Sequence, residues 1–300
     1  MRIYYSPRFM EHKQPASTHP ERPERLSAIL AALERSGLRH ELAEPRAAEE
    51  QDLLLAHSER HVRSVRALSE QEYREDTDTG FEKHTYDIAR LAAGAAMDAA
   101  YNAMDTGEFS FALVRPPGHH AEREGFGGFC YFNNIAIALK NVLSMGIERA
   151  AVVDIDVHHG NGTQDIFLTD GRVFFLSLHQ DPYTTYPGTG FAGESSQHIL
   201  NVELPRGTGD EVYLQALSAA LERVKAFAPK IVGISAGFDT FVRDPVAELG
   251  IEMSETYYRI GALINKIDCP KFACLEGGYH LPKLGENVVS FLRAFDRPGQ

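Results

Sequence analysis

Residue types that bind transition metals stand together near the middle of the chain. Asp156 and His158 are two positions apart and end the apolar run that begins at residue 150. On an extended backbone, residues two apart leave the same face of the strand. A carboxylate and an imidazole that converge at a strand end can form half of a zinc site. An isolated Asp-x-His pair also has another interpretation, a buried ion pair or the capped start of a helix.

Polar clusters of the same kind follow four further apolar runs, which favours the metal-site interpretation. In an open parallel α/β sheet, the ligand site lies beyond the carboxyl ends of the strands. Five such clusters at one edge of a sheet are hard to attribute to chance. The clusters are 115–120 with His119 and His120, 156–158 with Asp156 and His158, His179, 237–239 with Asp239, and 276–279 with Tyr279.

These clusters contain the parts of a hydrolytic metal site. Asp156, His158 and Asp239 offer one nitrogen and two carboxylate oxygens and leave positions open for water and substrate. A water bound to such a zinc has its pKa lowered toward ~7 and becomes a nucleophile. The water still needs a base and the leaving group an acid, and the adjacent His119 and His120 are the candidates. A tandem histidine elsewhere is usually a surface feature.

Three further residues can complete the site. Asp154 and Asn161 are candidates for hydrogen bonds that orient the two imidazoles. Tyr279 follows two glycines that let the backbone turn, and its hydroxyl can donate to a developing oxyanion. The alternative for Tyr279 is a loop aromatic without a catalytic role.

The composition limits the classes of function. The chain has 300 residues, a formal net charge of −12 and 43% hydrophobic residues, which suits one large α/β domain over residues 1–300. The acidic balance argues against direct nucleic-acid binding, and no apolar run is long enough to span a membrane. Three cysteines without CxxC spacing and the lack of a signal-peptide pattern predict a cytoplasmic protein. The oligomeric state is left open.

The order of the predicted elements gives the fold class. Strands that alternate with helices indicate right-handed βαβ crossovers and a parallel sheet covered on both faces. We expect helices at about 25–36, 49–69, 83–104, 132–145, 209–227, 253–267 and 283–295. We expect strands at 1–6, 109–114, 150–154, 173–178, 199–204, 231–235 and 271–275.

Two other motifs are interpreted as structural. His57 and His61 are four apart on a predicted helix, but the residues between them lack the glutamate of an HExxH site in that position. The segment 188–193 matches GxGxxG, yet no strand precedes it and no helix follows it. We therefore do not expect a dinucleotide site there.

Six segments together resemble the zinc-dependent histone deacetylase family, which includes bacterial histone deacetylase-like amidohydrolases and acetylpolyamine amidohydrolases. The segments are RPPGHHA (115–121), GFGGFCYFNN (125–134), DIDVHHGNGTQDIF (154–167), PGTG (187–190), GFD (237–239) and LEGGY (275–279). The resemblance runs from HPERPERL (19–26) to about residue 290, and Asn161 is similar to the class II branch. It implies an α/β fold, the three-layer αβα arginase–deacetylase fold with an eight-stranded, mainly parallel sheet.

The resemblance also implies roles for individual residues. His120 would act as general base and then acid, His119 would assist electrostatically, and Tyr279 would polarise the acetyl carbonyl. One catalytic zinc would be held by Asp156, His158 and Asp239. The substrate channel and the internal cavity beneath the zinc would involve Arg25, Gly128, Phe129, Tyr186 and Val246.

Structural potassium is implied at two places. The first site would use Asp154, Asp156, His158, Ser177 and Leu178. The second would be formed by main-chain oxygens near Phe167, Asp170 and Val173.

The substrate within the family is the main open question. We expect acetyl-lysine on proteins, with acetylpolyamines as the alternative. Human-type acetylpolyamine deacetylases have an acidic gatekeeper where this chain has Val246, and bacterial ones have an acid in the N-terminal loop, a role Glu11 can serve. Asp76 and Asp78 are further acids near the expected rim. DTFVRDPV (239–246) is similar to the polyamine enzymes, whereas the segment 70–82 is shorter than their insertion.

Two other functions are weighed against deacetylation. Arginase-type enzymes of related fold use two manganese ions, but Phe241 stands where the second carboxylate would be needed. A non-catalytic acetyl-lysine binding protein is the remote alternative. Such a protein needs the channel but neither His120 nor Tyr279, and both are present.

Overall fold

One sheet of eight parallel strands runs through the chain, whose computed structural model describes residues 1–14, 16, 18–74 and 78–296. The strand order is β2-β1-β3-β8-β7-β4-β5-β6, and every pairing is parallel. The strands are Arg2–Tyr4 (β1), Glu41–Ala43 (β2), Ser110–Ala112 (β3), Ala150–Asp154 (β4), Val173–Gln180 (β5), Ile199–Leu204 (β6), Val232–Ala236 (β7) and Lys271–Leu275 (β8).

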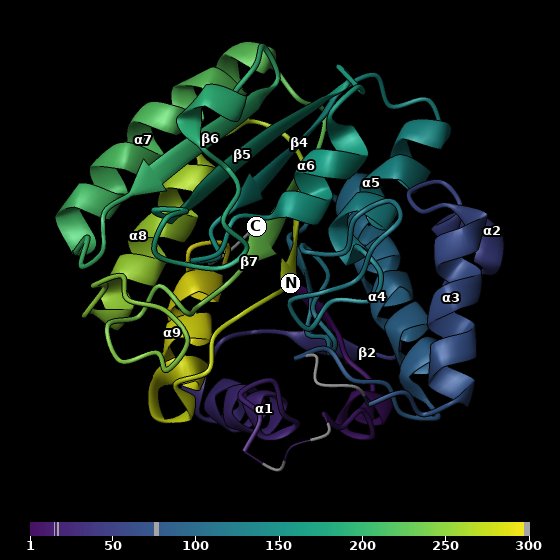
Figure 1. Cartoon of the computed structure of the whole chain (residues 1–300). Helices are drawn as coiled ribbons and strands as arrows, with labels where there is room; N and C mark the ends of the chain where they lie inside the picture. The colour runs from purple at the N-terminus through teal and green to yellow at the C-terminus, as the bar shows by residue number, and fades with distance from the viewer. Residues whose placement is uncertain (15, 17, 75–77, 297–300) are drawn as a thin grey trace.

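Helices cover both faces of this sheet. Figure 1 shows α7, α8 and α9 on one side and α4 and α5 on the other, while α1 packs against α9. The helices are Glu24–Ser36 (α1), Glu50–Leu53 (α2), Glu59–Glu70 (α3), Thr85–Thr106 (α4), Asn134–Ser144 (α5), Asn161–Phe167 (α6), Asp210–Phe227 (α7), Ser254–Asn265 (α8) and Leu281–Arg293 (α9). Short 3-10 turns lie at Pro7–Met10 and Ala192–Glu194.

The central strands are buried on both faces, which explains their continuous apolar sequences. Every residue of β4, β5, β7 and β8 is buried. The alanine-rich α4 is buried over most of its length, since small side chains let it lie close to the strands and to α5. A parallel sheet between two helical layers has this pattern.

The predicted three-layer αβα fold is confirmed, and the sheet is wholly parallel among the described strands. Two elements were not expected from the sequence. The strand β2 has three partly exposed residues, so its pattern carries no burial signal. The helix α6 begins at Asn161, in a segment outside the expected helix ranges. The region 49–69, expected as one helix, forms α2 and α3, because a new helix starts where Ser58 caps α3.

Two broader expectations can be set beside this architecture. The described helices include none with the length and apolarity required to cross a bilayer. A single domain over residues 1–300 stays a prediction, and the sheet that joins strands from Arg2 to Leu275 is compatible with it.

Candidate active site

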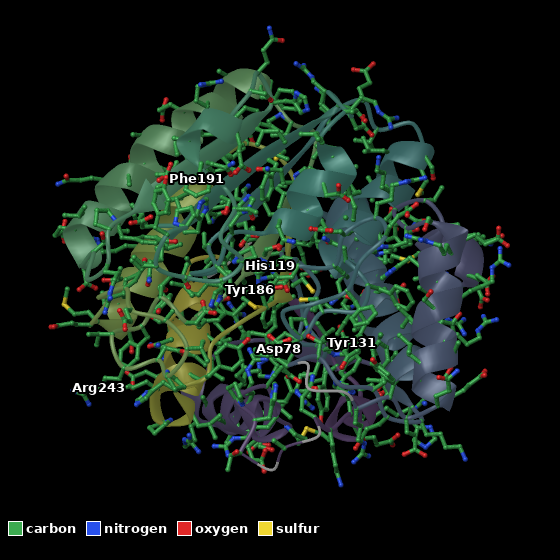
Figure 2. The ribbon with its side chains drawn as sticks, in the orientation of Figure 1. Asp78, His119, Tyr131, Tyr186, Phe191 and Arg243 are labelled. Atoms are coloured by element: carbon green, nitrogen blue, oxygen red, sulfur yellow. The ribbon has the colours of Figure 1, made fainter. Side chains whose placement is uncertain are left out.

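A narrow cavity of about 160 Å³ lies at the carboxyl edge of the sheet. Loops that follow β3, β4, β7 and β8 contribute to it, as the clusters in the sequence predict. Figure 2 shows His119, Tyr186 and Asp78 grouped near the centre of the molecule. The residues that line the cavity are Asp78, Pro117, His119, His120, Gly128, Phe129, His158, Tyr186, Val246, Gly277 and Tyr279.

The three predicted metal ligands converge beneath this cavity. Asp156, His158 and Asp239 each offer a ligand atom, and these atoms all lie within 4.8 Å of one another. His158 Nδ1 is 3.0 Å from Asp156 Oδ1 and 3.3 Å from Asp239 Oδ2. Tetrahedral zinc with ligands at about 2.0–2.2 Å holds neighbouring ligand atoms roughly 3.3 Å apart. The spacing therefore fits a zinc-sized ion.

The electrostatics of the triad also favour a cation. Burial lowers the pKa of His158, but the hydrogen bond to Asp156 and the nearby Asp239 carboxylate outweigh it and raise that pKa to about 10. The two buried carboxylates thus favour a proton on the imidazole. A bound metal ion would supply the positive charge in its place. Asp239 Oδ2 is buried and has no hydrogen-bond partner. An acceptor left in this state fits a metal ligand, because a buried unpaired carboxylate oxygen is otherwise costly.

Backbone amides hold the two carboxylates in place. Asp156 accepts from His158 N at 2.9 Å and from Gly277 N at 2.8 Å, and Asp239 accepts from Val157 N at 2.9 Å. A Cβ on Gly277 would lie 2.0 Å from Asp239 Oδ2, so only glycine allows this close approach. The loops after β4, β7 and β8 are thereby joined around one point.

The tandem histidines have separate partners. His119 Nδ1 lies 2.9 Å from Asp154 Oδ2, and His120 Nδ1 lies 2.7 Å from Asn161 Oδ1. The Asn161 amide nitrogen donates to Glu122 Oε1 at 2.8 Å, which turns its oxygen toward His120. His120 must then carry its proton on Nδ1, which leaves the lone pair of Nε2 available to act as a base.

The same surroundings set the two protonation states apart. Burial lowers the pKa of His119, but Asp154 and Asp156 raise it to about 10. Burial, with His119 and His158 nearby, holds the pKa of His120 well below its usual value. These surroundings favour a protonated His119 and a neutral His120, the pairing expected for an electrostatic group beside a general base.

Tyr279 faces the same cavity from the turn after β8. Burial keeps its pKa well above the ordinary value, so the phenol stays protonated and able to donate. Arg25 lies over its ring at 4.8 Å, and Phe129 meets the ring edge-on at 5.9 Å. These contacts hold the side chain between the channel and the interior.

Four of the five residues predicted for the channel and the internal cavity line the cavity, and Arg25 lies deeper. Gly128, Phe129, Tyr186 and Val246 line the cavity, and Tyr186 stands edge-on to His120 at 4.9 Å. Arg25 is not among the described lining residues. It is fully buried beneath Tyr279, donates to the Gly278 carbonyl at 2.7 Å and to the Glu276 carbonyl, and pairs with Glu21.

The acids considered for the rim differ in position. Asp78 lines the mouth, and its carbonyl lies 3.0 Å from His19 Nε2. Glu11 does not line the cavity and lies 3.9 Å from Arg8. Asp76 lies outside the described residues. Of the two acids that the structure describes, Asp78 is the one placed to meet a substrate.

The residues predicted for potassium lie in two groups. Asp154 pairs with Ser177 across β4 and β5, and Leu178 follows. In the second group, Asp170 N donates to the Phe167 carbonyl and Val173 N to the Asp170 carbonyl, each at 3.0 Å. Each of these carbonyls keeps a second lone pair. Potassium at either place stays a prediction.

The motifs interpreted as structural have structural partners. His57 Nδ1 lies 2.9 Å from the Glu122 carbonyl and its Nε2 accepts from Asn133 N, while His61 Nε2 lies 2.8 Å from the Tyr131 carbonyl. In 188–193, Glu194 accepts from the backbone amides of this loop. These hydrogen bonds are compatible with the structural interpretation of both motifs.

Three carboxylates around the site were not assigned these contacts from the sequence. Glu122 orients Asn161, Glu276 accepts from the backbone of Gly118 and His119, and Asp244 contacts the turn of Tyr279. All three bind amide groups, for which the sequence has no specific signal. Their proximity to the polar clusters was the one available hint.

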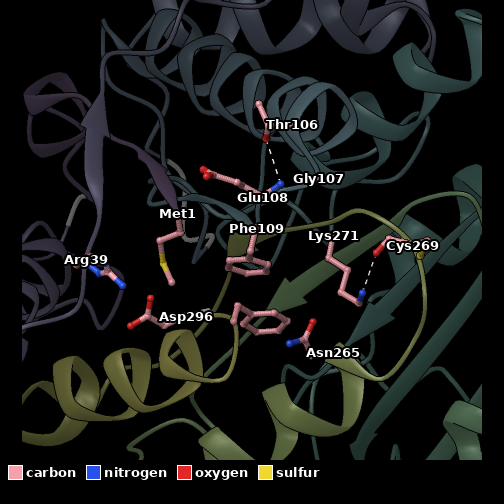
Figure 3. Close-up of a pocket in the computed structure, with 11 residues that line it drawn as sticks. Met1, Arg39, Thr106, Gly107, Glu108, Phe109, Asn265, Cys269, Lys271 and Asp296 are labelled. Atoms are coloured by element: carbon pink, nitrogen blue, oxygen red, sulfur yellow. Dashed lines mark hydrogen bonds between the residues drawn. The ribbon is translucent and has the colours of Figure 1, made fainter. Parts of the chain in front are cut away.

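A second cavity lies at the opposite, amino edge of the sheet. It measures about 400 Å³, and the residues drawn in Figure 3 line it. Phe109 stacks on Phe295 at 3.9 Å, and Lys271 Nζ donates to the Cys269 carbonyl at 2.7 Å. Among the described residues, this cavity has no counterpart of the Asp156, His158 and Asp239 group.

Fold and site together are those of the arginase–deacetylase class, with a candidate metal site of two carboxylates and one imidazole. Residues 19–295 match the histone deacetylase domain, and the chain belongs to this family. Its members act on acetyl amides, and this chain is an enzyme of that kind.

Relatives and solved structures agree with the family. A probable deacetylase of Methanothermobacter thermautotrophicus is 41% identical over 99% of this chain and 91% of its own length. The acetylpolyamine amidohydrolase of Mycoplana ramosa is 37% identical over 72% of this chain and 65% of its own length. The crystal structure of the HDA15 HD domain has a TM-score of 0.92 at 34% identity, covering 98% of this chain and 90% of that one. An acetylpolyamine aminohydrolase from Burkholderia pseudomallei has a TM-score of 0.88 at 28% identity, with 98% of both chains covered.

Proposed function

We propose that the chain is a zinc-dependent hydrolase that removes acetyl groups from the ends of alkylamine chains, and that acetyl-lysine in a peptide is its preferred substrate. The observation that carries the proposal is that all the groups needed for amide hydrolysis meet at one narrow cavity. They are the Asp156, His158 and Asp239 triad, a neutral His120 and a protonated Tyr279. A reader of acetyl-lysine would need the cavity alone.

The residues divide the work of amide hydrolysis. A divalent metal in the triad would polarise a carbonyl and lower the pKa of a water. His120 accepts a proton from the water that attacks the acetyl carbon, and returns it to the amine as the C–N bond breaks. Tyr279 donates a hydrogen bond to the oxygen that gains negative charge. Asp154 favours the cationic form of His119, and this positive charge stabilises the negative charge that develops on the acetyl oxygen.

The charge at the mouth supports a peptide substrate. Asp78 is the sole carboxylate among the described residues that line the cavity, and it is exposed. An exposed ion pair contributes about 1 kcal/mol or less, so its attraction for a second ammonium group of a polyamine is small. A carboxylate at a rim can equally accept from a peptide N–H. Val246 adds no charge there.

Acetylpolyamine hydrolysis is the second candidate. Relatives named acetylpolyamine amidohydrolase favour it, and Asp78 provides one rim charge. If polyamines are the substrate, the negative charge of Asp78 is needed, not merely its ability to accept a hydrogen bond.

The test compares kcat/KM on an acetyl-lysine peptide with kcat/KM on acetylputrescine and acetylspermidine. The wild type should prefer the peptide, and Val246→Glu should move the ratio toward polyamines. Asp78→Asn keeps an acceptor while removing the charge, and Glu11→Ala is the matched control at an exposed acid away from the cavity. A tenfold wild-type preference for polyamines that Asp78→Asn abolishes would reverse the substrate assignment.

A further inference from the structure

One buried carboxylate joins the rim of the cavity to the turn that carries Tyr279. Asp244 lies in the loop after β7, five residues beyond Asp239, and is 7% exposed. Its Oδ2 accepts from Tyr279 N at 2.6 Å and from His280 N at 3.2 Å, and its Oδ1 accepts from Val246 N at 3.1 Å. Three backbone amides from two sides of the cavity thus meet on one side chain.

The turn that Asp244 holds is rich in glycine, and Arg25 also holds it by donating to the Gly278 carbonyl at 2.7 Å. Tyr279 follows Gly277 and Gly278, and Gly278 adopts φ +118°, a conformation open to glycine and rare for other residues. Two glycines supply no side chains to pack this backbone. A rotation of the backbone at residue 279 would displace the phenol hydroxyl, which lies at the far end of the side chain. The hydrogen bonds from the amides of 279 and 280 to the Asp244 carboxyl group oppose that rotation.

The contacts of Asp244 separate it from the groups that do chemistry. It is not among the described residues that line the cavity, so it does not touch substrate there. Glu276 has the corresponding relation to the histidine turn, accepting from Gly118 N at 2.7 Å and His119 N at 3.2 Å. Each catalytic turn is thus anchored by its own buried carboxylate, and Asp244 serves the tyrosine.

We propose that Asp244 is a positioning residue that fixes the backbone of Tyr279, and with it the hydroxyl that meets the substrate oxygen. The inference rests on the proposed deacetylation, since it gives Tyr279 the role of oxyanion donor. A displacement of about 1 Å can cost about 100-fold in rate. Loss of the anchor should therefore lower kcat while leaving the metal ligands and the channel walls in place.

The test is a double-mutant cycle between Asp244→Asn and Tyr279→Phe. Asp244→Asn should lower kcat by about 10- to 100-fold, with KM and zinc content per chain nearly unchanged. In the Tyr279→Phe background the same substitution should cost about twofold or less, because the hydroxyl it positions is already gone. Glu276→Gln should keep its full cost in that background, because it acts on the histidine turn.

Asp210→Asn is the matched control. Asp210 also accepts from two successive backbone amides, Glu252 N at 3.2 Å and Met253 N at 3.3 Å, at the start of α8 and outside the described lining of the cavity. It should lower stability without changing kcat. If Asp244→Asn does not fold, Asp244→Glu keeps the carboxylate and carries the same cycle.

The outcomes separate the two levels of inference. If the wild type hydrolyses no acetyl amide, the proposed function fails. If the wild type is active but Asp244→Asn and Tyr279→Phe lower kcat additively, or Asp244→Asn acts through loss of zinc, Asp244 is not a positioning residue for Tyr279.

Discussion

The two edges of the sheet differ in what their cavities contain, and the larger of the two cavities is not the one with reactive groups. The amino-edge cavity, at about 400 Å³, is larger than the carboxyl-edge cavity of about 160 Å³. At the amino edge, Lys271 donates to a neighbouring carbonyl and two phenylalanines stack. At the carboxyl edge, Asp239 Oδ2 and Glu276 Oε1 are buried with no hydrogen-bond partner. The carboxyl edge is thus distinguished by buried polar groups that converge on one point and include atoms without a hydrogen-bond partner.

Strand direction produces this asymmetry. All eight strands are parallel, so every loop that follows a strand emerges at the same edge. Asp156, Asp239 and Glu276 come from three such loops, yet they lie around one point because β4, β7 and β8 are neighbours in the sheet. If this contrast is real, substitutions at the carboxyl edge should affect catalysis, and those at the amino edge should affect stability alone.

The largest effect is expected from Asp239→Asn. A neutral amide is a far poorer zinc ligand than a carboxylate, so metal and activity should be lost together. The loss should exceed about 10³-fold in kcat/KM, since even one oxyanion donor contributes about 10²–10³-fold. Metal analysis per chain and turnover on an acetyl-lysine peptide are the measurements. Two tightly bound transition ions in the wild type, or full activity after chelation, would contradict a one-zinc site.

The next largest effect is expected from Tyr279→Phe. It should retain zinc and fold but lower kcat by about 10²-fold or more, which corresponds to roughly 3 kcal/mol of transition-state stabilisation. His120→Ala should be at least as damaging, because the same imidazole handles both proton transfers. Steady-state kinetics and zinc content decide the matter. A Tyr279→Phe enzyme with normal kcat would reduce the tyrosine to a structural role.

Acid should weaken the carboxyl edge through a buried histidine. Burial lowers the pKa of His57 to about 3, below the ordinary value of 6.5. Between these values the unfolded chain binds a proton that the folded chain does not, so stability falls as pH falls from 6.5, by at most about 1.4 kcal/mol per pH unit. Urea unfolding at pH 7 and pH 5 should show a smaller difference for His57→Gln than for wild type. An equal difference would mean that His57 does not contribute to the acid sensitivity.

The smallest effect on catalysis is expected at the amino edge. Lys271→Met removes the donor to the part-buried Cys269 carbonyl, and the loss of such a hydrogen bond costs about 0.5–1.5 kcal/mol. Urea unfolding should report that loss, while kcat/KM on the same peptide stays at the wild-type value. A fall in kcat/KM with unchanged stability would show that the two edges are coupled, and would break the comparison.

Much of the fold could be predicted because strands that are buried on both faces have continuous apolar sequences. The strands β4 and β8 have the bounds expected from their continuous apolar runs, since both faces of each are covered. The strand β2 has no such mark, because its three residues are not fully buried. The start of α3 at Ser58 depends on a cap that a helical period alone does not reveal.

The site was predictable where function requires a particular side chain at a strand end. Asp156 and Asp239 belong to this class. The roles of Asp244 and Glu276 were not, because they bind backbone amides, and any residue except proline has one. The position of Asp78 at the mouth depends on how a long loop crosses the surface, which local pattern does not determine.

The glycines around the site have a consequence for enzyme redesign. Among the described residues, two glycines line the cavity: a Cβ would lie 2.3 Å from His120 Cδ2 at Gly128, and 2.0 Å from Asp239 Oδ2 at Gly277. At these positions the wall is already bare main chain, so no substitution can remove atoms to admit a bulkier acyl group. The course of the main chain therefore sets the upper limit on acyl size at these positions. More room at Gly128 or Gly277 would require a shift of the loops that carry them.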